Sequence, residues 1–309
     1  MTSSNRVVIF GASGNVGQFV VPALHRAGLE ITVVSHYASQ SDLVSIIRGH
    51  AFVVSLLSAG VLELQINIID AAVEAGATLF IPSEFGHDTT NEDVSRLLPV
   101  FGAKAGIIEY LREREKHGLS WTGIITALFF DWGLPRGAFD IDYKAGKATI
   151  WDGGDTVFSA ANMIDIAASL VTLITDPSAR ERYKNQHVYV SSVQTTQYEI
   201  LAAVEAAPAK KFASTEFDSE EVYADASPQV LPVLQALQLS KRGLSDYQAR
   251  VDAGHNRFII DAKRDVPTSQ PLTTLRFIYS EAALAYPAVP DHFCRLSQFK
   301  DVISRFAMA

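Results

Sequence analysis

The sequence predicts an α/β fold with a Rossmann-like, doubly wound parallel sheet and a smaller C-terminal substrate-binding region. Two observations predict it. Short apolar runs alternate with amphipathic stretches of helical period through the first half of the 309-residue chain. Gly11, Gly14 and Gly17 also stand directly after the apolar run 7–10 and directly before the first helical stretch. Right-handed crossovers between such strands place helices on both faces of a sheet.

The elements of the first half follow in strict alternation. The predicted strands are 7–10, 31–34, 51–57, 78–82 and 121–127, and the predicted helices are 15–27, 40–48, 62–75 and 103–117. Gly76 and Gly118 stand where helix ends are expected. Each pair of strands with its intervening helix is a unit of a parallel sheet.

The second half is less regular. Its predicted strands are near 148–151, 187–191 and 211–217, and its predicted helices are 162–175, 197–206 and much of 220–254. We therefore expect an NAD(P)-binding core over residues 1–130 and a substrate-binding region over 131–309 whose strands return to the core. A single integrated domain is the alternative.

Composition excludes several classes of protein. The formal net charge of −8 disfavours a nucleic-acid partner. A single cysteine, Cys294, allows no internal disulfide bond. No apolar run is long enough for a membrane span and no leader pattern precedes the first strand, so the expected location is cytoplasmic. Metal-ligand spacings and the Gly-x-Ser-x-Gly nucleophile motif are both missing, so no metal site is expected.

The glycine-rich loop has a physical function in a dinucleotide site. Gly11 permits a tight turn, Gly14 allows the backbone to approach a diphosphate, and Gly17 lets the helix pack on the strand. The N–H groups at the helix start then face the phosphates. The predicted cofactor-binding residues here are Gly11, Ser13, Gly14, Asn15, Val16 and Gly17. A glycine turn that binds nothing is the alternative.

Several segments together resemble the isoflavone reductase-like and NmrA-like group of atypical short-chain dehydrogenases. They are the glycine loop 11–17, the helix 65–76, the strand end 80–86, the helix 101–110 and the strand and loop 121–133. The strand end, Phe-Ile-Pro-Ser-Glu-Phe-Gly, is the most specific of them. The resemblance implies a Rossmann core that binds NADP(H), with NAD(H) as the alternative, and a small-molecule substrate that is aromatic or heterocyclic.

The resemblance also implies the roles of individual residues. Lys104 corresponds to the lysine that acts as general acid or orients the substrate, and no Tyr-x-x-x-Lys motif competes with it. Ser55 and Ser83 end predicted strands where the dinucleotide is expected to lie. The predicted substrate pocket contains Glu84, Phe85, Phe129, Phe130 and Trp132. Simple packing in the core is the alternative for each aromatic residue.

One segment departs from the family pattern. Strand 31–34 is followed directly by Ser35, His36 and Tyr37, without the arginine that holds a 2′-phosphate or an acidic residue for the ribose. Roughly a dozen residues, and with them one edge strand, are missing from the pattern. Three interpretations stay open: a reduced adenosine pocket that includes Ser35 and His36, an impaired cofactor site, and a gene-model artefact.

Three functions are therefore weighed. The first is an NAD(P)H-dependent reductase of a small organic substrate. The second is a non-redox isomerase or cyclase on the same fold, which the shortened segment favours. The third is a dinucleotide-sensing regulatory protein that needs no catalytic acid. Lys104 favours an enzyme, and the sequence leaves the oligomeric state open.

Overall fold

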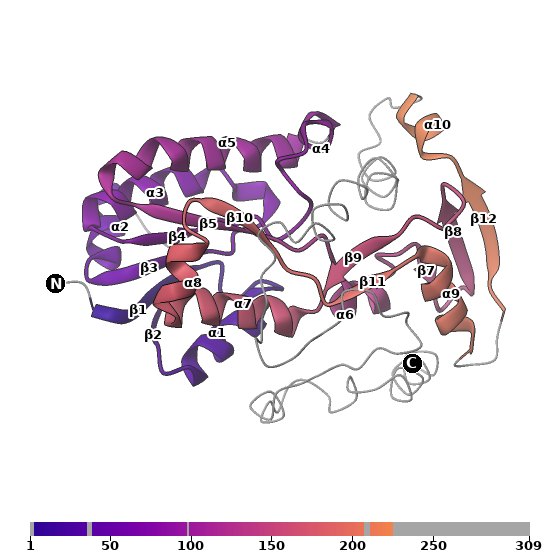
Figure 1. Ribbon diagram of the computed structural model, residues 1–309, viewed down its shortest axis with the longest axis horizontal. Helices are drawn as coiled ribbons and strands as arrows, with labels where there is room; N and C mark the ends of the chain where they lie inside the picture. The colour runs from indigo at the N-terminus through magenta and orange to yellow at the C-terminus, as the bar shows by residue number, and fades with distance from the viewer. Residues whose placement is uncertain (1–2, 36–38, 98, 207–210, 225–309) are drawn as a thin grey trace. The chain divides into compact units, whose positions relative to one another are not determined.

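The computed structural model describes residues 3–35, 39–97, 99–206 and 211–224, and these fall into two compact units (Figure 1). The first unit contains the described residues up to 127 together with 163–190. The second contains 128–162 and the described residues from 191 onward. The chain thus leaves the first unit after Ala127 and returns to it at Met163.

A six-stranded sheet forms the centre of the first unit. In spatial order its strands are β10 (Gln186–Tyr189), β5 (Ser120–Ile125), β4 (Leu79–Ile81), β3 (His50–Ser55), β1 (Ser3–Phe10) and β2 (Glu30–Val34). Every neighbouring pair is parallel. The predicted fold class is confirmed, and β2 lies at the edge of this sheet.

Helices cover both faces of the sheet, as a doubly wound fold requires. They are α1 (Gly17–Arg26), α2 (Gln40–Ile47), α3 (Leu64–Ala75), α4 (Glu92–Leu97), α5 (Pro99–Arg114), α7 (Met163–Thr175) and α8 (Pro177–Arg182). Figure 1 shows α2, α3 and α5 on one face and α1 and α7 on the other. The contacts of α1 with α7, and of α3 with both α2 and α5, agree with this arrangement.

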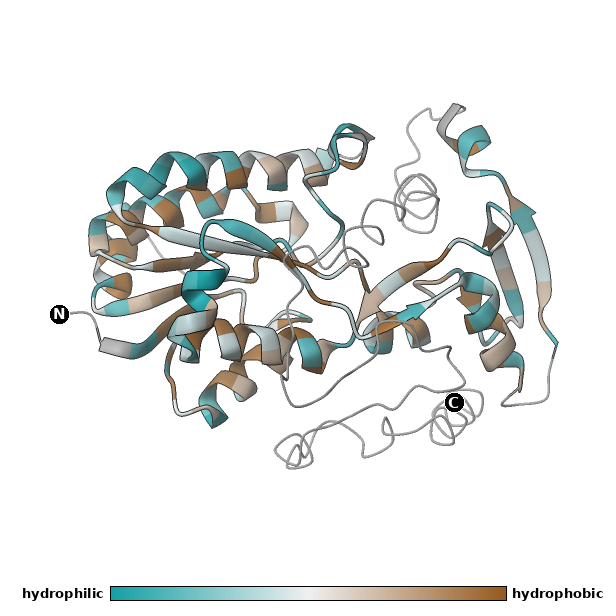
Figure 2. Ribbon diagram, in the orientation of Figure 1, coloured by the Kyte–Doolittle hydropathy of each residue, from teal (hydrophilic) through white to brown (hydrophobic). Residues whose placement is uncertain are grey.

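Hydrophobic patterning explains why this unit folds. All six residues of β3 are buried, as expected for a central parallel strand between two helical layers. Figure 2 shows hydrophobic residues along the strands of the sheet, whereas α5 carries many hydrophilic residues as well. The core includes Phe10, Phe80 and Trp121, each almost fully buried. None of the helices in the described ranges has both the length and the apolar character of a membrane span.

Two small sheets and their helices form the second unit. One sheet has the order β11 (Val193–Thr195), β9 (Phe158–Ala161) and β6 (Leu128–Phe129), and the other β12 (Ala213–Phe217), β8 (Lys147–Trp151) and β7 (Ile141–Asp142). The helices are α6 (Phe130–Gly133), α9 (Gln197–Ala206) and α10 (Ser219–Ala224). Most of the predicted helical stretch 220–254, and also Cys294, lie outside the described residues.

Some predicted boundaries differ from the observed ones. The helix expected over 103–117 begins at Pro99, and its last turn is a 3₁₀ helix, η2 (Glu115–His117). Two further 3₁₀ helices, η1 (Ala59–Val61) and η3 (Leu134–Arg136), were not predicted. Short 3₁₀ segments have little periodicity, so sequence patterning does not detect them.

Candidate active site

The glycine loop lies between β1 and α1, at the carboxyl end of the sheet. Gly11 has φ +78°, and a Cβ atom there would lie 2.5 Å from the Leu56 carbonyl oxygen. A Cβ atom at Gly17 would lie 2.1 Å from the Ala12 carbonyl oxygen. Both positions therefore require glycine: Gly11 for the predicted turn, and Gly17 because the start of α1 packs against the loop backbone at Ala12 rather than against the strand.

The same loop presents free donors at the start of α1. Ser13, Gly14 and Asn15 are exposed. Gly14 N–H bonds to the Gly11 carbonyl at 3.0 Å, but the N–H groups of Ser13, Asn15 and Val16 bond to no described residue. Unpaired backbone N–H groups at a helix N-terminus form a favourable environment for a phosphate anion. This part of the chain therefore fits a dinucleotide diphosphate.

Two serines end strands beside this loop. Ser55 is fully buried at the end of β3, and its hydroxyl has no hydrogen-bond partner among the described residues. Ser83 follows β4, and its hydroxyl donates to the Leu57 carbonyl at 2.7 Å. The Ser83 N–H donates to the Gln65 side chain at 2.9 Å. Ser83 therefore orients backbone, whereas the Ser55 hydroxyl keeps its hydrogen-bonding capacity.

The region after β2 contains the predicted adenosine pocket. Ser35 is exposed, and His36 lies outside the described residues. The next described residue, Ser39, caps α2 by accepting a hydrogen bond from the Asp42 N–H at 3.2 Å. Asp42 itself lies in the first turn of α2. The described residues here supply hydroxyl groups and a carboxylate.

Lys104 lies on α5 and points at the loop that follows β4. Its ammonium donates a hydrogen bond to the Glu84 backbone carbonyl and lies 5.9 Å from the Phe101 ring centroid. Burial lowers the pKa of Lys104 below its ordinary value, and the nearby Glu84 carboxylate opposes that shift. A lysine with a lowered pKa is a better proton donor near neutral pH than a solvated one.

His87 is the nearest titratable neighbour that sequence reasoning missed. It is buried, its ring meets Phe101 edge-to-face with centroids 5.3 Å apart, and its Nε2 has no hydrogen-bond partner among the described residues. Burial, reinforced by the Lys104 charge, lowers the pKa of His87 to about 4. His87 is therefore a neutral imidazole beside the lysine at neutral pH.

This shift predicts an acid-sensitive contribution to stability. Because the folded pKa of His87 lies below its ordinary value of 6.5, the unfolded chain binds the proton more tightly. The contribution is complete above pH 6.5 and is lost as the pH falls toward 4. We expect a loss on the order of 1–2 kcal/mol in the free energy of unfolding.

Urea unfolding of the wild type and of His87→Asn, near pH 7 and near pH 5, measures this contribution. The decline in unfolding free energy between the two pH values should be smaller in the variant. His117→Asn, at an exposed histidine, is the control and should keep the wild-type decline. Equal declines in wild type and His87→Asn would contradict the assignment.

The loop after β4 is held by buried polar contacts. The Glu84 side chain is 1% exposed, and it accepts a 2.5 Å hydrogen bond from the Thr89 hydroxyl. Its Oε2 lies 3.6 Å from Nε2 of His187 on β10. Asp88 accepts a 3.0 Å hydrogen bond from the hydroxyl of Tyr189, also on β10. The predicted pocket residue Glu84 thus directs its carboxylate into the interior of the first unit.

The predicted aromatic pocket residues are divided between the units. Phe85 is buried in the first unit, with φ +31°. In the second unit, Phe130 belongs to the core and packs on Phe139 with ring centroids 5.6 Å apart. Phe129 and Trp132 are half-buried there, edge-to-face at 6.3 Å. The structure thus does not place these residues in one described cavity.

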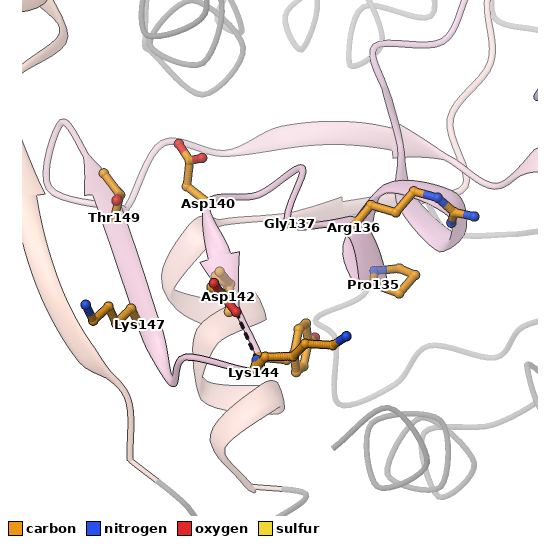
Figure 3. A pocket seen from close by; sticks show the side chains of 10 residues that line it. Pro135, Arg136, Gly137, Asp140, Asp142, Lys144, Lys147 and Thr149 are labelled. Carbon is orange, nitrogen blue, oxygen red and sulfur yellow. Dashed lines mark hydrogen bonds between the residues drawn. The ribbon is translucent and has the colours of Figure 1, made fainter. Parts of the chain in front are cut away.

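The second unit has a separate cavity of about 440 Å³, shown in Figure 3. Arg136, Lys144 and Lys147 are among its lining residues. Lys144 and Lys147 point away from each other (Figure 3), and Arg136 donates to the Trp132 carbonyl. The cations therefore do not converge on one point, as side chains that bind a single anion would. The described residues contain no cluster of side chains suited to a metal ion.

Comparison with known proteins gives a consistent result. The model of the NmrA-like family matches residues 31–257. "Oxidoreductase aprR" of Aspergillus flavus is 30% identical over 244 residues, which is 72% of this chain and 78% of that protein. Among solved structures, an isoflavone reductase has a TM-score of 0.62 at 24% identity, covering 77% of this chain and 88% of that one. The leucoanthocyanidin reductase–NADPH complex of Vitis vinifera has a TM-score of 0.64 at 18% identity, covering 98% of this chain and 100% of that one.

Proposed function

Because this chain belongs to the NmrA-like family, we propose that it is an NAD(P)H-dependent reductase of a small organic substrate. The observation that carries the proposal is the loop 11–17, with unpaired N–H groups at the start of α1. The leucoanthocyanidin reductase that was solved in complex with NADPH shares the fold, and aprR, at 30% identity, is named an oxidoreductase. Fold and family both support the proposal.

The residues of the loop suit a dinucleotide in more than one way. The N–H groups of Ser13, Asn15 and Val16 are available for the diphosphate, and a Cβ atom would meet no atom closer than 3.3 Å at Gly14. The buried hydroxyl of Ser55 adds an unused polar group at the neighbouring strand end. A bound NADPH or NADH would supply the hydride.

Lys104 provides the proton in this proposal. Its hydrogen bond to the Glu84 carbonyl fixes the ammonium, and burial lowers its pKa. The lowered pKa favours a general acid that protonates the substrate, and the hydrogen bond orients the ammonium. The neutral His87 beside it adds no competing positive charge, because its own pKa is about 4.

The substrate class that we propose is aromatic or heterocyclic. The half-buried Phe129 and Trp132, which meet edge-to-face in the second unit, are side chains that favour flat apolar molecules. The structural relatives named above include an isoflavone reductase and a leucoanthocyanidin reductase. A panel of flavonoid-type carbonyl and benzylic substrates is therefore the first to test.

Titration with NADPH and NADH, followed by the fluorescence of the bound nicotinamide, tests the proposal. We expect micromolar binding of at least one dinucleotide and its oxidation in the presence of a panel substrate. Binding without turnover of any substrate would support a dinucleotide-sensing regulator instead. Absence of binding would overturn the reductase and leave the non-redox isomerase or cyclase.

We predict weak selection between the two dinucleotides. Ser35 and residues 39–42 supply no arginine or lysine for the 2′-phosphate of NADPH, and the first turn of α2 contains Asp42. The ratio of the two dissociation constants should therefore stay below about a hundredfold, that is, below about 2.7 kcal/mol. Fluorescence titration of both cofactors measures it, and a larger preference for NADPH would contradict the prediction.

The variant Ser35→Arg sharpens this test. A guanidinium there should tighten NADPH binding by about tenfold and leave NADH binding unchanged, because only NADPH has the 2′-phosphate. Ser35→Gln is the matched control, since it adds a long side chain without the charge. Equal effects of Ser35→Arg on both cofactors would show that Ser35 lies away from the adenosine ribose.

A further inference from the structure

Strand β10 supplies two side chains that contact the loop supporting Lys104. His187 and Tyr189 are two residues apart, so both lie on the same face of the strand. His187 Nε2 lies 3.6 Å from the Glu84 carboxylate, and the Tyr189 hydroxyl donates a 3.0 Å hydrogen bond to the Asp88 carboxylate. One strand therefore contacts both buried carboxylates of this loop.

The sequence leaves room for this contact at Gly123, in the middle of β5. A Cβ atom at Gly123 would lie 2.7 Å from the His187 ring and 3.3 Å from Glu84 Cγ. The His187 ring also packs edge-to-face on Trp121, with centroids 5.3 Å apart. Glycine inside a strand lowers stability and marks a close approach. Here it makes room for the His187–Glu84 contact, which any larger residue would disrupt.

The contact is linked to Lys104 through one peptide unit. The Glu84 carboxylate accepts a hydrogen bond from Thr89 and lies 3.6 Å from His187 Nε2, which makes no hydrogen bond within the described residues. The Glu84 backbone carbonyl accepts the hydrogen bond from Lys104. The next residue, Phe85, has φ +31°, and its N–H donates to the Ile124 carbonyl at 2.9 Å. A non-glycine residue with this φ persists only where its surroundings hold it. The direction of the Glu84 carbonyl therefore depends on the contacts that anchor the loop.

We propose that His187 and Tyr189 are positioning residues for Lys104. They act through the loop: their contacts with Glu84 and Asp88 hold the loop whose Glu84 carbonyl accepts the hydrogen bond from the ammonium. The role of Lys104 in turnover rests on the proposed reductase function. The burial of its ammonium and the hydrogen bond to Glu84 are independent of that function. Replacing residues that orient a catalytic group in this way changes the pKa of that group as well as the rate of the reaction.

The pKa of Lys104 is a measure of how firmly the loop is held. Burial is the main cause of the lowered pKa, so a loosened loop that admits water should bring the pKa back up toward its ordinary value. The titratable groups that act on the ammonium are Glu84, which raises its pKa, and His87, whose own pKa of about 4 leaves it neutral at higher pH. Neither group reverses the expected direction.

The decisive experiment measures the Lys104 pKa in the cofactor-free protein. The rate at which acetic anhydride acetylates Lys104 is followed against pH by mass spectrometry of its peptide, in wild type, Tyr189→Phe and His187→Gln. We expect the pKa of Lys104 to rise by about one unit in both variants. Tyr189→Phe removes a single hydroxyl, so it keeps the test available if His187→Gln does not fold.

Tyr110→Phe is the matched control. Tyr110 lies on α5 with Lys104, and its hydroxyl donates 2.8 Å hydrogen bonds to the Asp70 carboxylate. The variant Tyr110→Phe removes a tyrosine–aspartate hydrogen bond in the same unit, at a site away from the loop after β4. We expect it to lower the melting temperature without changing the Lys104 pKa.

Turnover supplies the second measurement. In Tyr189→Phe, kcat should fall about tenfold with KM and dinucleotide affinity unchanged, the loss expected for one hydrogen bond to a charged group. An unchanged Lys104 pKa, together with a loss of thermal stability like that of Tyr110→Phe, would overturn the proposal and leave a purely structural role. If the wild type turns over no substrate, the reductase assignment fails, and acetylation alone still decides the positioning role.

Discussion

Replacing Lys104 by methionine is expected to lower kcat by about 10²- to 10⁴-fold, the range associated with loss of a general acid. Methionine keeps the length and apolar stem of lysine but removes the proton. The dissociation constants for NADPH and NADH should stay within about threefold of wild type, because the loop 11–17 is unchanged. Single-turnover kinetics and fluorescence titration separate the two quantities.

Stability supplies an independent readout for Lys104. Burial disfavours the charged form of this lysine, so the variant Lys104→Met should be at least as stable as the wild type. Lys116→Met, at an exposed lysine, is the control and should leave kcat unchanged. A Lys104→Met variant with wild-type turnover would remove Lys104 from the mechanism. A large loss of stability would instead indicate a structural residue.

The pH dependence of turnover follows from the same shift. A general acid loses activity as the pH rises through its pKa. The alkaline limb of kcat should therefore lie below the ordinary lysine value of 10.5, because burial lowers the pKa of Lys104. In Lys104→Met this limb should disappear.

Local patterns explain what the sequence predicted correctly. The glycine turn at 11–17 and the alternation of strands and helices both depend on residues close together in the chain. Glycine spacing, apolar runs and helix period report such local structure directly. The confirmed fold class of the first unit, and the edge position of β2, follow from these signals.

The contacts of the β4 loop could not be predicted in the same way. Glu84 and His187 are separated by about a hundred residues of sequence. Only the return of the chain from the second unit to β10 brings them together, and no local pattern encodes that pairing. Gly123 was the one available signal, because a glycine inside an apolar strand marks a close approach by another group.

Buried polar groups distinguish this loop from ordinary packing. Glu84, Thr89 and His187 are all buried in the first unit, where leaving a charge or hydroxyl unpaired is costly. An apolar replacement would serve the fold as well or better. Their presence beside a lysine of lowered pKa supports the proposed role of this loop in positioning Lys104.

The glycine loop carries the second large prediction. In Gly17→Ala, the new Cβ atom would lie 2.1 Å from the Ala12 carbonyl oxygen and 2.5 Å from its carbon. Both are backbone atoms, so the start of α1 must move away from the loop. We expect a cost of about 3 kcal/mol, at the upper end for overpacking, and a melting temperature lower by about 6 °C or more. Calorimetry measures it.

Gly106→Ala is the control for the alanine itself. Gly106 is exposed on α5, and a Cβ atom there would meet nothing within 4 Å. Alanine at such a helical position should raise stability by about 0.5–1 kcal/mol. A destabilised Gly106→Ala would show that the effect at Gly17 is not specific to its steric contact.

A contrast within the loop separates folding from cofactor binding. A Cβ atom at Gly14 would lie 3.3 Å from the Gly11 carbonyl oxygen, and Gly14 is exposed. Gly14→Ala should therefore keep the wild-type melting temperature but weaken dinucleotide binding by about tenfold or more, because the methyl group stands where a diphosphate approaches the backbone. Gly17→Ala should lower both. Only a ligand that lies against the backbone would clash with the new methyl group. If Gly14→Ala bound NADPH and NADH as tightly as wild type, the loop would therefore be a structural turn.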